Sequence, residues 1–152
     1  MKKVCFVAST GGHFEQLMML KPLMDKYESF IITEKTTYKS IKDGGKAYYL
    51  KQVNRQEKMW ILKTISNSIS SLKIFIKEKP DIVISTGALA TVPMCIMAKI
   101  FRKKLIYIES FAKVTSRTVT GKLLYKFADQ FYVQWEDMLE VYPNAIYKGG
   151  IY

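Results

Sequence analysis

Short apolar runs recur along this chain with helix-like patterns between them, and this alternation limits the possible folds more than any other feature. The apolar runs predict six strands, at Val4–Ala8, Ser29–Thr33, Ala47–Leu50, Asp81–Ser85, Lys103–Ser110 and Asp129–Gln134. Strands that alternate with helices form a parallel sheet covered on both faces. We therefore predict an α/β fold with a Rossmann-like, doubly wound, mainly parallel sheet.

The segments between the strands carry helix patterns broken by proline and glycine. The predicted helices are Phe14–Lys26, Glu57–Glu78, a helix with Pro93 in its first turn, Gly121–Ala128 and Glu136–Tyr142. Pro22 is expected to kink or split the first of them. A polar loop follows the second strand, with a turn at Gly44–Gly45. No repeat or linker interrupts residues 1–152, which we expect to form one domain.

Composition narrows the class of protein. No apolar run approaches the ~20 residues that span a bilayer. The first apolar run stops at Ala8 in a glycine turn, so we expect a buried strand there and not a signal peptide. Cys5 and Cys95 lie inside apolar segments, which indicates packing roles in a reduced, cytoplasmic protein.

The net charge of +11 is the clearest compositional signal. It implies an anionic partner, either nucleic acid, anionic lipid or a phosphorylated substrate, with a merely solvated basic surface as the alternative. The region Arg55–Lys79 mixes apolar residues with lysines, and residues 92–104 end in a basic cluster. Each region is either helix packed on the sheet or a surface that meets anionic headgroups.

Three loops are expected at the carboxyl edge of the sheet, where ligands of such folds bind. They are Ser9–His13, Thr86–Ala88 and Glu109–Lys113. In the first loop, the adjacent glycines let a ligand approach the backbone, and the following helix start offers free N–H groups to an anion. The alternative is a tight turn without a ligand. His13 is a candidate base or phosphate donor, or else a capping or packed histidine.

Several common sites are excluded. The first loop lacks the G-x-G-x-x-G of dinucleotide sites, and Glu34 as a ribose-binding acid cannot replace those glycines. The segment Gly44–Ala47 fails as a P-loop, and neither a metal-ligand spacing nor a nucleophile elbow is present. The aromatic residues of 126–135 are expected in the core, so we predict no nucleic-acid partner. A salt-sensitive nucleic-acid-binding module remains the weakest alternative.

Three stretches together carry a family resemblance: "ASTGGHFEQL", "STGALATVP" and above all "YIESFAKVTSRTVTGKLLYKFADQFYVQW". They resemble the membrane-recruiting, acceptor-side subunit of the two-part dolichol-linked GlcNAc transferase, and most closely its bacterial relatives in capsular and exopolysaccharide synthesis. The resemblance covers nearly the whole chain. The "GGH" turn is also similar to that of the peptidoglycan GlcNAc transferase, which acts on a lipid-linked acceptor.

The resemblance implies half of an enzyme. The chain would be equivalent to the N-terminal domain of a GT-B glycosyltransferase, and a separate donor-binding subunit would hold the UDP-sugar. This chain would bind no cofactor or metal of its own and would be inactive, or nearly so, alone. Its acceptor would be a sugar linked to polyprenyl diphosphate.

Site residues follow from the resemblance by position. His13 is the candidate base and Glu109 the second, although both could instead only position the acceptor. The residues expected to bind the acceptor are Ser9, Thr10, Gly11, Gly12, Thr86, Gly87, Ser110, Phe111, Lys113 and Arg117. Of these, Lys113 and Arg117 would meet anionic groups.

Two functions remain open from the sequence. In the first, the chain binds the acceptor and activates its catalytic partner; in the second, it is a non-catalytic scaffold that only stabilises the transferase. Eukaryotic members carry an N-terminal membrane anchor, whereas this chain begins directly at its first strand. We therefore expect peripheral attachment to the anionic inner face of a bacterial membrane.

Overall fold

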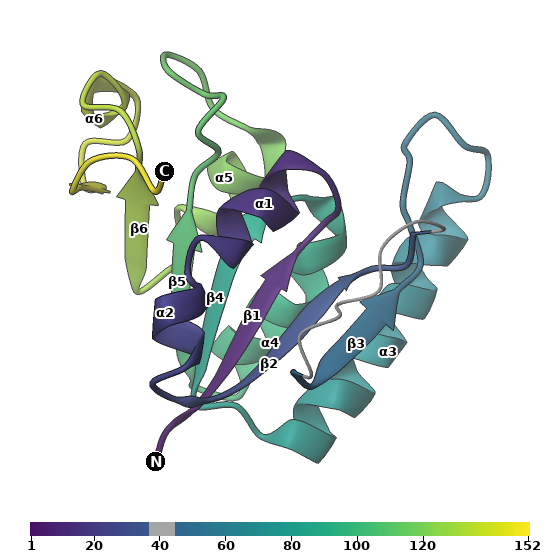
Figure 1. The fold of residues 1–152 in the computed structure, drawn as a ribbon. Coiled ribbons are helices and arrows are strands. Elements are labelled where there is room, and N and C mark those ends of the chain that lie inside the picture. Colours follow the sequence, from purple (N-terminus) through teal and green to yellow (C-terminus); the bar gives the residue numbers. More distant parts are fainter. Residues whose placement is uncertain (37–44) are drawn as a thin grey trace.

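The computed structural model describes residues 1–36 and 45–152, so Gly44 of the predicted glycine turn lies outside the described residues. Its strands form one parallel sheet in the order β3-β2-β1-β4-β5-β6-β7 (Figure 1). The strands are β1 (Lys3–Ala8), β2 (Glu28–Glu34), β3 (Ala47–Leu50), β4 (Ile82–Gly87), β5 (Lys104–Ile108), β6 (Gln130–Val133) and β7 (Ile146–Tyr147). The six predicted strands are confirmed, and the two-residue β7 was not predicted.

The helices differ from the predictions mainly at their ends. They are α1 (Gly12–Met18), α2 (Lys21–Met24), α3 (Trp60–Glu78), the 3-10 turn η1 (Leu89–Thr91), α4 (Val92–Ile100), α5 (Val119–Leu124) and α6 (Met138–Val141). Pro22 lies in the first turn of α2 and splits the predicted helix in two. Likewise, Pro93 lies in the first turn of α4, as expected.

Local hydrogen bonds set the starts of α3 and α5, which differ from the predictions. Before α3, the N–H of Trp60 donates to the carbonyl of Glu57 at 3.2 Å, so residues 57–59 form a turn and the helix begins at Trp60. The hydroxyl of Thr118 accepts from the N–H of Gly121 at 2.8 Å. This cap begins α5 at Val119, two residues earlier than predicted.

Helices cover both faces of the sheet, with α1 and α2 on one side and α3 and α4 on the other (Figure 1). Side chains of the buried strand β1 alternate between the two faces of the sheet and pack in both layers. Val4, Phe6 and Ala8 pack in the cluster beneath α1 and α2. Cys5 and Val7 pack in the opposite cluster, which also holds Cys95. Because successive side chains of a strand point to opposite faces, one apolar run supplies both cores.

Both cysteines are buried, as predicted. Burial raises the pKa of the Cys5 thiol well above its usual range and that of Cys95 to about 12. Phe131 is buried as expected, whereas Phe127 is half-exposed. Within the described part of the chain, no helix has both the length and the apolar character needed to cross a membrane.

A buried carboxylate joins α3 to the sheet. Glu78 ends α3 and accepts from Lys46 at 2.6 Å, from Lys3 at 3.4 Å and from the hydroxyl of Tyr48. Burial alone would raise the pKa of Glu78, but the hydrogen bonds from these three groups outweigh it and lower the pKa to about 2. The charge of Glu78 therefore contributes to folding.

Candidate functional site

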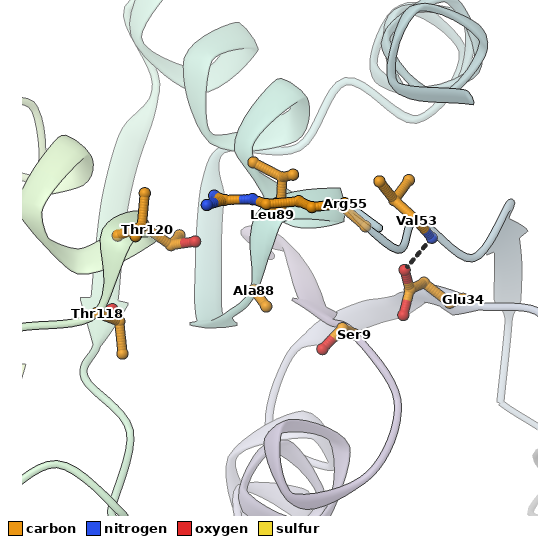
Figure 2. A pocket seen from close by; sticks show the side chains of 10 residues that line it. Ser9, Glu34, Val53, Arg55, Ala88, Leu89, Thr118 and Thr120 are labelled. Carbon is orange, nitrogen blue, oxygen red and sulfur yellow. Dashed lines mark hydrogen bonds between the residues drawn. The ribbon is translucent and has the colours of Figure 1, made fainter. Parts of the chain in front are cut away.

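A pocket lies where the strand order reverses, between β1 and β4, which is where open α/β sheets bind ligands. We call it the switch-point pocket, and its volume is about 320 Å³. Its lining residues are Ser9, Glu34, Val53, Arg55, Ala88, Leu89, Ala90, Thr118, Val119 and Thr120 (Figure 2). They come from two of the three predicted loops, from the continuation of the third, from the end of β2 and from the segment that follows β3.

Glu34 connects the first glycine turn to the segment that follows β3. One carboxylate oxygen accepts from the N–H of Val53 at 3.0 Å, the bond drawn in Figure 2. The other accepts from the N–H of Thr10 at 3.4 Å. Both carboxylate oxygens of Glu34 are therefore hydrogen-bonded within the protein, and the side chain joins the two loops.

Arg55 supplies the positive charge of the switch-point pocket. Figure 2 shows its side chain lying across the pocket, with the guanidinium directed toward Thr120. Ser9 and Thr118 belong to the same lining, but the hydroxyl proton of Thr118 is donated to Glu109. A guanidinium beside the hydroxyl of Ser9 suits a phosphate group, because arginine offers several N–H donors in one plane.

His13 is fixed by a pair of hydrogen bonds to Thr86. Its Nδ1 lies 2.7 Å from the carbonyl oxygen of Thr86, and the hydroxyl of Thr86 donates to the carbonyl of His13 at 2.7 Å. A carbonyl can only accept, so the proton of the neutral ring is on Nδ1 and Nε2 is left as the acceptor. No hydrogen bond to Nε2 occurs among residues 1–36 and 45–152. The geometry is that of a base held in one tautomer.

Gly87 makes room for this ring. Its φ is +98°, a backbone conformation that favours glycine. A Cβ atom built on Gly87 would lie 3.1 Å from both Nδ1 and Cε1 of His13. In addition, the carbonyl of Gly87 accepts from the N–H of Ser9 at 2.9 Å. The first two predicted loops are therefore joined at Ser9, His13, Thr86 and Gly87.

Glu109 lies inside the protein, not at the pocket surface. It is 1% exposed, and its carboxylate accepts from the hydroxyls of Thr118 at 2.8 Å and Tyr142 at 2.7 Å. The N–H of Ser110 donates to it at 2.9 Å. Burial and the bond to Glu109 raise the pKa of Tyr142 well above its usual range, so the phenol stays a donor. This placement favours the positioning role of Glu109 over the role of a base.

The start of the third loop is tied to α1. Gln16 of α1 is buried, and its Oε1 accepts from the N–H of Phe111 at 3.1 Å and from Nε2 of Gln134 at 2.7 Å. The carbonyl of Phe111 accepts from Nε1 of Trp135 at 2.7 Å, and the two rings pack with centroids 4.8 Å apart. Ser110 is also buried. Phe111 therefore has a packing role in the wall of the site.

The two predicted cations of the third loop lie apart from the switch-point pocket. The guanidinium of Arg117 donates to the carbonyl of Val141 at 2.6 Å and lies 5.1 Å from the centre of the Tyr142 ring. It is thus engaged by the residues around α6. Lys113 is half-buried, with its N–H donating to the carbonyl of Ser110 at 3.0 Å, and it does not line the pocket.

The predicted loops contribute to the switch-point pocket, but few of the predicted site residues line it. Of the predicted site residues, Ser9 alone lines the switch-point pocket. Thr10, Gly11 and Gly12 lie in the turn beside it, and Gly11 has a φ of +71°. Arg55 and Val53 were missed, because only the pairing of β3 with β2 brings them to this edge. In the described residues, no group of three or more His, Cys, Asp or Glu could hold a metal ion.

A known family matches nearly the whole chain. The family described as "Oligosaccharide biosynthesis protein Alg14 like" matches residues 4–151. The chain belongs to this Alg14-like family. Two relatives carry the name UDP-N-acetylglucosamine transferase subunit ALG14. The one from Yarrowia lipolytica is 29% identical, over 97% of this chain and 80% of its own length. The human one is 26% identical, over 97% of this chain and 82% of its own.

Solved structures share the fold of this Alg14-like chain. MurG of Acinetobacter baumannii superimposes with a TM-score of 0.75 at 18% identity, over 90% of this chain and 43% of that one. A UDP-GlcNAc 2-epimerase from Neisseria meningitidis gives 0.72 at 16% identity, over 98% of this chain and 47% of that one. The Alg14-like chain thus spans less than half of each. The predicted Rossmann-like fold, equivalent to the N-terminal domain of a GT-B glycosyltransferase, is confirmed.

Proposed function

We propose that residues 1–152 form one acceptor-binding domain, which is a subunit of a two-chain UDP-sugar glycosyltransferase. The match to relatives named as UDP-N-acetylglucosamine transferase subunits, over nearly the whole chain, is the observation that carries this proposal. The acceptor is a sugar on polyprenyl diphosphate, and the product is a repeat unit of a bacterial capsular polysaccharide or exopolysaccharide. The resemblance of the Glu109–Trp135 stretch to bacterial members supports this choice of pathway.

The donor site belongs to a second polypeptide. In this proposal a catalytic subunit binds the UDP-sugar and docks against the carboxyl edge of the sheet, so that the active cleft forms between the two chains. The names of the relatives support it, because each is called a subunit. Alone, the chain would have little or no activity.

His13 takes the proton of the acceptor. As the acceptor oxygen bonds to the anomeric carbon, the bond from that carbon to the leaving UDP breaks, and the hydroxyl proton passes to Nε2 of His13. The bond from Nδ1 to the carbonyl of Thr86 supports this assignment, because it holds the ring with Nε2 unprotonated. A developing positive charge on the ring is also stabilised by that carbonyl.

The diphosphate of the acceptor lies in and beside the switch-point pocket. Arg55 is the cation that binds it, and the hydroxyl of Ser9 adds a donor. The turn of Thr10, Gly11 and Gly12, together with Thr86 and Gly87, brings backbone close to the ligand. Glu109, Ser110 and Phe111 shape the wall, with Lys113 and Arg117 as outer charges.

The polyprenyl chain of such an acceptor stays in a bilayer, so the subunit works at a membrane surface. We place it peripherally on the cytoplasmic face of a bacterial membrane. The net charge of +11 supports attraction to anionic lipids there. The proposed cellular partners are thus the donor-binding subunit, the lipid-linked acceptor and the anionic bilayer.

The test begins with the tagged chain purified from its host, membranes included, and with mass spectrometry of what accompanies it. We expect a second chain with a nucleotide-sugar-binding sequence. Sugar transfer by the pair is then compared for the wild type, His13→Ala and Glu15→Ala, a neighbouring exposed residue of α1. His13→Ala should lower transfer by about 10²-fold or more with the complex intact, and Glu15→Ala should not.

Two results would contradict the proposal in different ways. If no such chain accompanies the protein, or nucleic acid does, the two-chain enzyme is wrong. If the complex forms and His13→Ala transfers sugar at the wild-type rate, the chain is a scaffold that only stabilises its partner.

A further inference from the structure

Helix α3 presents an apolar stripe to solvent. We define the α3 stripe as Leu62, Ile65, Ile69, Leu72 and Ile76, which recur every three or four residues and so share one side of the helix. Leu62, Ile65, Ile69 and Ile76 are 58%, 52%, 52% and 55% exposed. The stripe runs for about 21 Å along the helix at 1.5 Å per residue.

The stripe lies opposite the side of α3 that packs on the sheet. The buried residues of α3 include Asn67, Ser71 and Glu78, and on a helix of 3.6 residues per turn they fall about half a turn from the stripe. A surface helix of a soluble protein usually directs apolar residues inward and polar ones outward. In α3, three polar residues are buried beside Ile74 and Phe75 while the outer side is aliphatic. Among residues 1–36 and 45–152, the stripe is therefore an apolar surface without a partner.

Cations border the α3 stripe. Lys73 and Lys77 follow one side of it along the helix, whereas Lys63 is paired with Glu57 just before the helix. The sole acidic residue of α3 is Glu78, whose side chain is 2% exposed and bound to Lys46 and Lys3. The exposed surface of α3 is therefore apolar and positively charged. Helices that lie in the interface of an anionic bilayer combine these two properties.

The same features argue against a protein partner. Protein interfaces are depleted in lysine and enriched in aromatic residues at their centres, whereas the α3 stripe contains only leucine and isoleucine and has lysine along its edge. A second copy of this chain would bring two molecules of charge +11 together through lysine-bordered surfaces. A bilayer with anionic headgroups matches both the shape and the charge of this surface.

The stripe also begins beside the candidate site. Val53 and Arg55 line the switch-point pocket and lie in the segment that leads directly into α3. Met59, at the end of that segment, is exposed. Figure 1 shows α3 behind β3, at one end of the sheet. A membrane on this side would lie next to the pocket.

We infer that the α3 stripe is the surface by which this chain docks on an anionic bilayer, with the helix parallel to the membrane plane. The inference rests on the proposed function in one respect, because a lipid-linked acceptor requires the pocket to be near the membrane. The contact itself needs no acceptor and no second subunit. The aliphatic side chains enter the headgroup region while the lysines meet the anionic lipids.

The experiment measures binding of the purified full chain to sedimenting vesicles of phosphatidylcholine and phosphatidylglycerol in equal parts, and to vesicles of phosphatidylcholine alone. The stripe variant is Ile65→Gln/Ile69→Gln, which exchanges two exposed residues for good helix formers. Met19→Gln alters an exposed residue on the other face of the sheet and serves as the control. Lys73→Gln removes one bordering charge.

We expect binding to the anionic vesicles, a loss of tenfold or more in the stripe variant and no loss in Met19→Gln. Lys73→Gln should weaken binding about fivefold. Circular dichroism checks that each variant is folded. The inference is overturned if the folded stripe variant binds as the wild type does, if the wild type does not bind, or if the stripe variant loses only self-association or its protein partner. Sugar transfer by the pair to a short-chain acceptor in detergent tests the proposed function separately and should be retained by the stripe variant.

Discussion

Replacing Glu109 by glutamine tests whether this carboxylate holds the third loop or performs chemistry. The side chain is 1% exposed and accepts three short hydrogen bonds, from Thr118, Tyr142 and the N–H of Ser110. Glutamine has nearly the same shape but is neutral, and one of its two ends is a donor. Whichever way the amide is turned, an NH2 group faces at least one of these donors.

The expected loss of unfolding free energy follows from those contacts. A hydrogen bond to a charged group contributes about 1.5–3 kcal/mol and one between neutral groups about 1 kcal/mol. Weakening three bonds in this way, with one buried donor left without a good acceptor, should cost about 2–4 kcal/mol of unfolding free energy. Tyr142→Phe removes one of the three bonds and should cost about 1–2 kcal/mol.

Urea unfolding followed by circular dichroism measures both variants against the wild type. Glu109→Gln should also reduce sugar transfer by the pair, but at low temperature, where the variant is folded, most of that transfer should return. If Glu109→Gln is as stable as the wild type and transfer is nevertheless lost, Glu109 acts on the substrate and its role as a loop anchor is refuted.

Three further predictions concern other parts of the fold. Gly87 has a φ of +98°, and a Cβ atom there would lie 3.1 Å from His13, so Gly87→Ala should cost about 1–3 kcal/mol of unfolding free energy in a urea titration. Sugar transfer by the folded variant should fall by more than this loss of stability explains. Arg55→Ala should raise the KM for the diphosphate-linked acceptor about tenfold with little change in kcat, and Arg55→Lys should restore part of the loss; an unchanged KM would remove Arg55 from the site. Because the pKa of Glu78 falls from its ordinary value of 4.5 to about 2 on folding, the protein should lose on the order of 3 kcal/mol as the pH falls from 4.5 toward 2, and urea titrations of Glu78→Gln should lack that loss.

The sequence predicted the elements of this fold well because each depends on local chemistry. The apolar runs of β1 and β4 are buried on both faces, and Pro22 divides a helix where its ring prevents continuation. Helix ends were less accurate, since the start of α3 depends on a turn at Glu57 that has no strong capping signal.

The candidate site was harder to predict because it forms from distant segments. A glutamate directly after a strand suggests an exposed catalytic group, yet Glu109 is buried by a tyrosine 33 residues further along the chain. Arg55 lies in a loop without a motif and reaches the pocket only through the position of β3 in the sheet. Arg117, chosen for its charge, is bound by the backbone near α6 instead.

The join between the first two loops has a consequence for mutational tolerance. The carbonyl of Thr86 holds His13, and the carbonyl of Gly87 holds Ser9, so both contacts are made by main-chain atoms. A new side chain at position 86, or any residue except proline at position 9, leaves these atoms in place, although a change at position 86 to a residue without a hydroxyl removes the bond from Thr86 to the carbonyl of His13. Substitution is restricted mainly at Gly87, where space and φ both demand glycine. The orientation of the imidazole thus depends on main-chain atoms and on Gly87 more than on the neighbouring side chains.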